Sequence, residues 1–429
     1  MKKILVAITA IMALGSASYG QTWINDSLTM GMGTGNDVFY SMNNGIVRTE
    51  DNKNWHMAFT MSAGDSSGIW ANHNSGNNFT KVFNTHKDSS QWNTITLADT
   101  ASSTVCFNNH DGWYSGAFNN KPGVGPFDFG WGKYDPVSHN IIGDSIFIVR
   151  VSTGYYKVWI KQLVSTQMEY TVQVGDMATN QTTVYTVARS PKFMNRLMAY
   201  FNLSTGVDTN REPEISSWDL LFTRYTTDAP GSGQFPNNNV IGTLSNKNVK
   251  VARAQNIQVD TAFNTYYNFA GNWATHIAGV GYNWKSFDMS TNTWAVADSN
   301  SYFVEDRAGN LWQMQFTAYS GSATGNINLR KRIVAPTSVN DVASIITKYS
   351  LSPNPSNHTL HIAIDAKSTS EAQLVVIDMS GRVLTQKNLK INNGLNAFNL
   401  PVSQWSQGQY LLQIKGDNIQ IAEFFIVNH

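Results

Sequence analysis

The sequence has little that could cross-link its fold or give it a strong charge. Of its 429 residues only Cys106 is a cysteine, so no disulfide can form within the chain. Charged residues make up 14%, well below the roughly 25% of typical soluble domains, and the formal net charge is +1. Such a chain has no general attraction to nucleic acid or to an anionic membrane. Stability must come from buried apolar surface, and we expect Cys106 to be a small buried side chain.

Long apolar runs are also scarce. One run, from Ile4 to Leu14, follows two lysines and precedes small residues. This is the pattern of a secretory signal peptide, which we place at residues 1–20. No later run approaches the roughly 18 apolar residues that a membrane-spanning helix needs. We therefore expect an exported protein without a transmembrane anchor.

Motifs for metal, nucleotide or redox chemistry are missing. The sequence contains no HExxH, CxxC, Walker or calcium-loop pattern. GDSSG, at residues 64–68, fits the Gly-x-Ser-x-Gly pattern of a hydrolase nucleophile. That nucleophile requires a helix after it, and the following IWANHNSGNN has no helical pattern. We expect a Gly/Ser turn here and a protein that is not an enzyme.

What the chain does have is the alternation of β-strands. Short runs of alternating apolar and polar residues are separated by clusters of Gly, Asn, Asp and Ser. Residues 144–163 and 300–319 each have the pattern of a strand, a glycine turn and a second strand. The sequence predicts an all-β fold with two related β-rich modules in tandem and a small C-terminal β-sandwich.

The two modules are predicted from four similar features that occur in the same order. VFYSMNNG, ending at Gly45, resembles AYFNLSTG, ending at Gly206. A tryptophan strand, segments at Gly130 and Gly281, and the two hairpins follow in both halves. This order indicates a tandem duplication. We place the first module at residues 21–190, the second at 191–332 and a linker at 333–348.

The tryptophan strand has the same alternation in both modules. Trp55, Met57 and Phe59 in the first correspond to Trp218, Leu220 and Phe222 in the second. Alternation places each of these rows on the core face of its strand. The residues between them, His56 and its counterpart Asp219, then lie on the opposite face. We therefore expect His56 to face solvent.

The C-terminal unit, residues 349–429, carries motifs that resemble the type A C-terminal sorting domain of the type IX secretion system of Bacteroidetes. The matching motif residues are Pro353, Asn354, Pro355, Gly381, Arg382, Gly408 and Tyr410. The resemblance implies an export signal whose partner is the outer-membrane translocon. It also implies that the cargo is secreted or attached to the outer cell surface.

The repeated module is similar in its tryptophan strand and closing hairpin to the HmuY-like family of secreted haem-binding proteins. In that family histidine or methionine side chains hold the haem iron. The resemblance implies a haem cofactor, and His276 is the one histidine of the second module. Its loop also holds Trp273, Tyr282 and Trp284, which suit an apolar cleft or a plain packed loop.

Two other functions stay open from the sequence. The 13 tryptophans could provide stacking surfaces for carbohydrate or peptide ligands. The duplication could also simply extend a structural adhesin.

Overall fold

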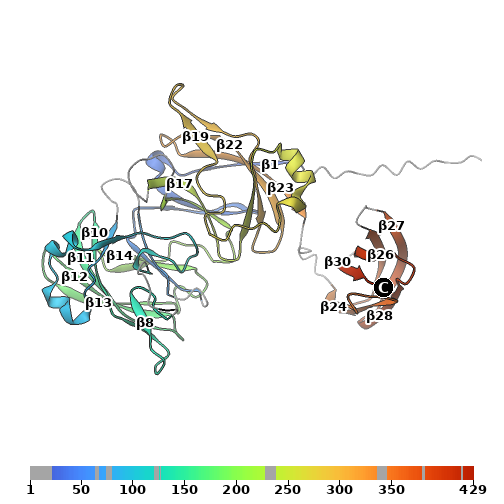
Figure 1. Cartoon of the computed structure of the whole chain (residues 1–429), viewed down its shortest axis with the longest axis horizontal. Helices are drawn as coiled ribbons and strands as arrows, with labels where there is room; N and C mark the ends of the chain where they lie inside the picture. Colours follow the sequence, from blue (N-terminus) through green and yellow to red (C-terminus); the bar gives the residue numbers. More distant parts are fainter. Residues whose placement is uncertain are drawn as a thin grey trace, which may run out of the picture. The chain divides into compact units, whose positions relative to one another are not determined.

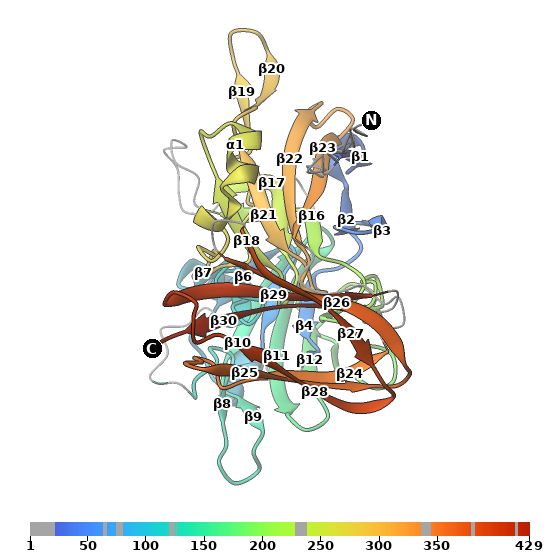
Figure 2. The same ribbon diagram turned by 90° about the vertical axis from the view of Figure 1, so that its right-hand side faces the viewer.

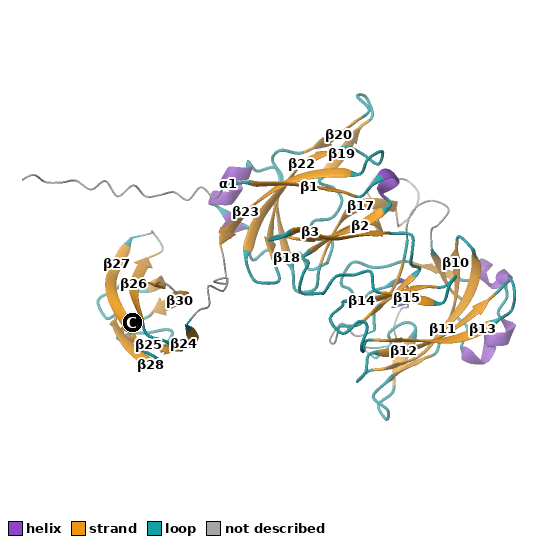
Figure 3. Ribbon diagram, turned by 180° about the vertical axis from the view of Figure 1, so that it is seen from behind, coloured by secondary structure: helices purple, strands orange, loops and turns teal. Residues whose placement is uncertain are grey.

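The computed structural model describes residues 22–62, 67–73, 80–119, 125, 127–227, 238–335, 345–378, 382–416 and 419–429. The predicted signal peptide, residues 64–66 of GDSSG and the motif residue Gly381 lie outside these ranges. The chain divides into two compact units, Met1–Ala335 and Pro336–His429. Antiparallel sheets dominate both units (Figure 3), which confirms the predicted all-β class. No helix in the described residues is long and apolar enough to cross a membrane.

The first unit contains two β-sandwiches, and one of them is contiguous in sequence. We call it the inserted sandwich. Its sheets have the orders β13-β12-β11-β10-β6-β7, with β9 beside β11 and β8 beside β9, and β15-β14-β4-β5. Its strands are β4 (Met57–Thr60), β5 (Ile69–Ala71), β6 (Lys81–Asn84), β7 (Thr104–Cys106), β8 (Gly132–Tyr134), β9 (Ile141–Gly143), β10 (Ile146–Val151), β11 (Gly154–Val164), β12 (Glu169–Asp176), β13 (Thr182–Ala188), β14 (Met198–Asn202) and β15 (Val207–Thr209). Short 3-10 turns are η2 (Ser89–Thr94), η3 (Leu97–Ala101) and η4 (Ala117–Asn119).

The other sandwich is assembled from both ends of the unit, and we call it the split sandwich (Figure 1). Its sheets have the orders β1-β23-β22-β21-β18 and β17-β16-β2-β3, with a separate hairpin β19-β20. Its strands are β1 (Ile24–Thr29), β2 (Asn36–Ser41), β3 (Gly45–Asp51), β16 (Leu220–Thr227), β17 (Asn238–Ser245), β18 (Lys250–Ala254), β19 (Lys285–Asp288), β20 (Thr293–Val296), β21 (Ser301–Glu305), β22 (Leu311–Tyr319) and β23 (Asn326–Ala335). The helical segments are η1 (Met32–Thr34), α1 (Val259–Asn264) and η5 (Tyr266–Asn268).

The strand pairing crosses the module boundary predicted at residue 190. The N-terminal strand β2 pairs with β16, and β14 pairs with β4. The loop length gives the physical reason. If β2 paired with β4, the strands β3 and β4 would run parallel on either side of β2. Parallel strands need a connection of about a dozen residues, but only 52–56 separate β3 from β4.

The strands that the sequence matched nevertheless occupy matching places. The order β3-β2-β16-β17 in one sandwich corresponds to β15-β14-β4-β5 in the other. The paired glycines Gly45 and Gly206 both adopt positive φ, 77° and 67°. The two predicted hairpins form as β10-β11 and β21-β22.

Each sandwich buries its own apolar core. Met57 and Phe59 of β4 lie in the core of the inserted sandwich, together with the fully buried Cys106. Leu220 and Phe222 of β16 lie in the core of the split sandwich. Four of the six residues in the two predicted core rows therefore lie in the cores. The prediction is wrong for the two tryptophans, because Trp218 and the half-buried Trp55 pack into a third cluster between the sandwiches.

His56 is buried, so the prediction that it faces solvent is wrong. Its Nδ1 accepts a hydrogen bond from the backbone N–H of Leu203, 3.0 Å away. The counterpart Asp219 accepts from the backbone N–H of Met42 at 2.7 Å. Leu203 directly follows β14, and Met42 directly follows β2. The hydrogen bond of His56 therefore joins β4 to the β14-β15 hairpin, and that of Asp219 joins β16 to the β2-β3 hairpin. Burial lowers the pKa of His56 to about 4.

The C-terminal unit is the predicted small sandwich. Its sheets have the orders β24-β25-β28 and β27-β26-β29-β30 around one apolar core. Its strands are β24 (Ile346–Ser352), β25 (Thr359–Ala366), β26 (Ser370–Asp378), β27 (Val383–Ile391), β28 (Gly394–Pro401), β29 (Gly408–Gly416) and β30 (Ile419–Val427). The predicted linker is shorter than expected, since residues 333–335 pair within β23 and 346–348 belong to β24.

Candidate functional site

The two sandwiches meet through the outer faces of their four-stranded sheets. A cluster of aromatic and aliphatic side chains from β2, β4, β5, β14 and β16 fills this junction. The rings of Phe39 and Trp218 meet edge to face with their centroids 5.1 Å apart. Strands β4 and β16 are therefore buried on both faces, which is why strict alternation failed to place His56.

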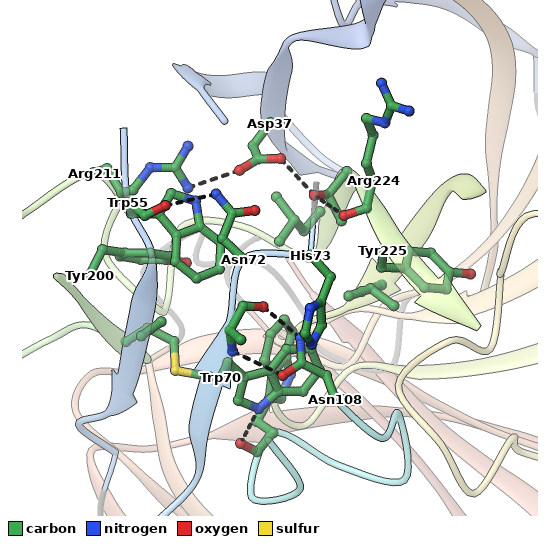
Figure 4. A pocket seen from close by; sticks show the side chains of 17 residues that line it. Asp37, Trp55, Trp70, Asn72, His73, Asn108, Tyr200, Arg211, Arg224 and Tyr225 are labelled. Carbon is green, nitrogen blue, oxygen red and sulfur yellow. Dashed lines mark hydrogen bonds and ion pairs between the residues drawn. The ribbon is translucent and has the colours of Figure 1, made fainter. Parts of the chain in front are cut away.

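A cavity of about 40 Å³ lies inside the junction (Figure 4). Its walls come from both sandwiches and include Trp55, Trp70 and Tyr225. Ligand pockets usually enclose roughly 300–1,000 Å³, whereas a single water needs roughly 10–15 Å³. The cavity can hold a few water molecules but not a haem or a sugar.

A buried ion pair crosses the junction at this cavity. Arg211, which follows β15, donates to the carboxylate of Asp37 on β2 at 2.9 Å, and both side chains are almost fully buried. Arg211 also donates to the carbonyl of Asp51 at 2.9 Å and lies over the ring of Tyr200. The hydroxyl of Thr223 donates to the other oxygen of Asp37 at 2.6 Å. The pair thus links a strand of one sandwich to a loop of the other.

The next residue, Glu212, is buried in the same junction. Its carboxylate accepts from the backbone N–H groups of Leu197 and Met198 at 2.8 and 3.1 Å. Burial raises the pKa of Glu212 to about 7. Arg211 and Glu212 therefore fix the junction and are not exposed to a ligand.

Two histidines of the inserted sandwich are packed at the rim of the junction. The Nδ1 of His73 lies 2.9 Å from the carbonyl oxygen of Thr80, and the ring of His110 lies 4.7 Å from that of Tyr225. Burial lowers the pKa of each to about 4, so both are neutral at pH 7. No group of three or more His, Cys, Asp or Glu residues suited to a metal occurs in the part of the chain that the structure describes.

His276, the predicted haem ligand, is exposed on the loop between α1 and β19. It lines a shallow groove of about 260 Å³ with Asp111, Tyr114, Lys247 and Asn248. Partial desolvation lowers the pKa of its imidazole, and the positive charge of the nearby Arg253 lowers it further.

The aromatic side chains expected around His276 do not form one cleft. Trp284 is buried in the core of the split sandwich and stacks on Phe316 at 4.0 Å. Tyr282 packs into the junction, and Trp273 packs against the small cluster beside α1. Of the two interpretations of this loop, an apolar cleft or a plain packed loop, the packed loop agrees with these positions, because the three rings pack into three different clusters.

A roomier pocket, of about 480 Å³, opens at the end of the split sandwich. We call it the split-sandwich end pocket. It is lined by Ser27, Leu28, Thr29, Ile46, Ala318, Tyr319, Ser320, Asn326 and Asn328. These described lining residues include no charged side chain, histidine or methionine. The buried hydroxyl of Tyr319 has no hydrogen-bond partner among the described residues.

An aromatic hairpin stands next to this pocket. Phe287 of β19 faces Trp294 of β20 with ring centroids 5.2 Å apart, and both rings are exposed, 41% and 37%. Trp294 also packs edge to face on Tyr319 at 5.0 Å, so the exposed rings adjoin the pocket wall. The pocket was missed at the sequence level because its Ser, Thr and Asn side chains resemble ordinary surface residues.

The sorting-motif residues of the C-terminal unit have structural roles. Asn354, between Pro353 and Pro355, accepts from the backbone N–H of Ile426 at 2.9 Å and so covers the edge of β30. The Arg382 side chain donates to Asp378 at 3.0 Å and closes the β26-β27 turn.

The remaining motif residues organise the start of β29. Gly408 begins that strand, and the hydroxyl of the buried Tyr410 donates to the carbonyl of Ser406 at 2.5 Å. The ring of Tyr410 stacks on Phe425 with centroids 5.7 Å apart. The motif thus stabilises the sandwich and its last strand.

Comparisons with known proteins support only the C-terminal unit. No curated protein matches the sequence. The crystal structure of dimeric latent PorU from Porphyromonas gingivalis is similar at 8% identity over 94% of this chain, with a TM-score of 0.17. This chain spans only 34% of that one. A BSP domain of a biofilm associated protein is similar at 9% identity over 95% of this chain and 81% of its own, with a TM-score of 0.16. TM-scores this low do not establish a shared fold.

The sorting domain, by contrast, is matched over its whole length. Residues 350–428 fit the family described as the secretion system C-terminal sorting domain. This domain indicates export to the cell surface or beyond it through the type IX machinery. The C-terminal unit therefore belongs to the type IX sorting-domain family, and the chain that carries it is a cargo protein of that pathway.

Proposed function

We propose that the cargo is a non-enzymatic protein that binds neutral carbohydrate outside the outer membrane. The sorting domain supports the location, and the first unit supplies the binding site. The observation that carries the proposal is the split-sandwich end pocket with its exposed aromatic hairpin.

The chemistry of this pocket suits a sugar. The hydroxyl of Ser27 and the amides of Asn326 and Asn328 offer both donors and acceptors without charge. The Thr29 hydroxyl is instead engaged with the backbone of Thr324 and Gly31. Sugar rings present hydroxyls at their edges and apolar C–H groups on their faces. The faces pack on exposed rings such as Trp294, whereas the edges bond to the amides and hydroxyls.

Haem binding, implied by the resemblance to HmuY-like proteins, is the second candidate. The exposed imidazole of His276 favours it, since an exposed side chain is accessible to a ligand. The groove beside it is small for a haem, and the larger end pocket offers no imidazole or thioether among its described lining residues. Carbohydrate fits these two surfaces better.

A pull-down assay tests the first candidate. The purified chain is incubated with immobilised dextran, mannan, xylan and galactan, and we expect it to bind at least one. Trp294→Ala and Asn328→Ala should each weaken that binding about fivefold, since each removes a contact of about 1 kcal/mol. Tyr267→Ala is the matched control, because Tyr267 is an exposed ring on η5 outside the pocket. Equal losses in all three variants, or no binding to any polysaccharide, would contradict the proposal.

A haem titration separates the two candidates. A Soret shift that disappears in His276→Ala would favour haem. Retention on beads that carry unfolded casein, but on no polysaccharide, would instead show a peptide-binding protein. Binding to none of these probes would leave the structural adhesin.

A further inference from the structure

The inserted sandwich has a pocket at the place that corresponds to the split-sandwich end pocket. The latter lies between the end of β1 and the β22-β23 turn. A pocket of about 380 Å³ lies between the end of β13 and the β11-β12 turn. Strand β13 pairs with β12 as β1 pairs with β23, so both pockets occupy the same position in the strand order. We call the second one the inserted-sandwich end pocket.

A hairpin arm, β8-β9, stands beside this second pocket, and an aromatic pair lies where the chain enters the arm. Tyr134 of β8 stacks on the exposed Phe127 with ring centroids 5.6 Å apart. At the start of β9, the side-chain oxygen of Asn140 accepts from the backbone N–H of Ser165, next to the pocket residue Thr166. The start of β9 therefore lies beside the turn that lines this pocket, as β20 lies beside the β22 end that lines the other. Two corresponding places in one chain thus carry an open pocket with a hairpin arm beside it.

The two arms point in opposite directions. Figure 2 shows β19-β20 at one end of the first unit and β8-β9 at the other, and Figure 1 agrees. A ligand at one site therefore leaves the other site open to a second ligand.

The linings differ in a way that keeps both pockets suited to hydroxyls. The inserted-sandwich end pocket contains Glu169 and Arg189 together with Thr166, Gln167 and Ser190. The two charges are opposite, so this pocket has no net charge. The carboxylate can accept and the guanidinium can donate hydrogen bonds to hydroxyl groups.

We propose that the protein is bivalent and cross-links neutral polysaccharide chains through these two end sites. This rests on the proposed carbohydrate binding and adds a second site and a consequence. When both sites of one protein molecule bind the same polysaccharide layer, the apparent affinity exceeds that of a single site by roughly 100-fold or more. The cargo would then act as a cross-linker of an extracellular polysaccharide layer.

Two paired variants of the full chain test this. Trp294→Ala/Asn328→Ala disables the split-sandwich site, and Glu169→Ala/Arg189→Ala disables the inserted-sandwich site. Each chain is mixed with the soluble polysaccharides of the panel, and light scattering reports cross-linking. Light scattering of the protein alone must give a monomer mass, and unchanged thermal unfolding must show that each variant folds.

The expected results are distinct for each hypothesis. The unaltered chain should cross-link, and either variant should bind but lose cross-linking, with apparent affinity for immobilised polymer reduced roughly 100-fold. Combining both pairs of substitutions should abolish binding. If the Glu169/Arg189 variant binds and cross-links like the unaltered chain, the second site is refuted while carbohydrate binding stands. If no chain binds any polysaccharide, both proposals fail.

Discussion

The ion pair between Asp37 and Arg211 should be essential to the junction of the two sandwiches. Asp37→Asn keeps the shape of the side chain and removes its charge. The guanidinium of Arg211 is 1% exposed, so it would remain buried without a counter-charge. Breaking a buried pair in this way costs about 3–5 kcal/mol. The loss should exceed that of an ordinary hydrogen bond, because the amide oxygen can still accept from Thr223 but the amide cannot balance the charge of Arg211.

A surface pair in the same unit provides the matched control. Lys192 and Asp208 lie 2.6 Å apart, but their side chains are 42% and 29% exposed. Water screens this pair, so Asp208→Asn should cost about 0–1 kcal/mol. Both substitutions replace one carboxylate by an amide, and only the burial differs.

Urea unfolding followed by tryptophan fluorescence measures the difference. A loss of about 3–5 kcal/mol should lower the midpoint by roughly 1 M or more. Because Asp37 and Arg211 belong to different sandwiches, a separate early transition would also indicate a loosened junction. Replacing the pair by Asp37→Leu with Arg211→Met should recover part of the loss, since no charge is then left buried. If Asp37→Asn destabilises no more than Asp208→Asn, the ion pair does not hold the junction.

Three further substitutions test other parts of the structure. The His56 pKa of about 4 lies below its usual 6.5, so its contribution is present above pH 6.5 and is lost as pH falls towards 4. His56→Asn should therefore remove about 3 kcal/mol of that acid sensitivity in pH-dependent urea unfolding; an unchanged pH profile would refute this. A Cβ at Gly143 would lie 1.7 Å from the carbonyl oxygen of Ile160, so Gly143→Ala should lower stability by about 1–3 kcal/mol in thermal unfolding, unlike Gly125→Ala at an open position. Asn354→Ala should cost about 1 kcal/mol and speed hydrogen exchange in β30 alone; uniform exchange would argue against its role at that edge.

The alternation of apolar and polar residues predicted most strands, because one face of each is buried and the other is exposed to solvent. The C-terminal strands, the two glycine hairpins and the rows of Met57, Phe59, Leu220 and Phe222 were identified on that basis. Alternation fails where both faces are buried. At the junction a second apolar cluster covers the outer face of β4 and β16, so the intervening His56 is buried although the pattern placed it outside.

The exchange of hairpins between the sandwiches could not be found by comparing the two halves. The hairpins β2-β3 and β14-β15 have similar sequences. Local sequence therefore does not predict which of them pairs with β4 and which with β16. The distinguishing quantity is the length of the connection. Residues 52–56 are too few for β4 to cross β2 and run parallel to β3. Strand β2 of this hairpin therefore pairs with the distant β16.

The split-sandwich end pocket depends on another pairing between distant parts of the chain. The split-sandwich end pocket joins residues 27–29 of β1 to residues 318–328, which are almost 300 positions away. No spacing rule connects them, and their serine, threonine and asparagine side chains are not distinctive one by one. They form a site only because β1 is drawn from the far end of the chain onto β23, where the β22-β23 turn is held beside Trp294. In the inserted sandwich β13 takes the same place through a contiguous chain. One strand order, reached by two different paths along the chain, therefore produces a pocket with a hairpin arm beside it at each end of the unit, which is the arrangement that bivalent binding requires.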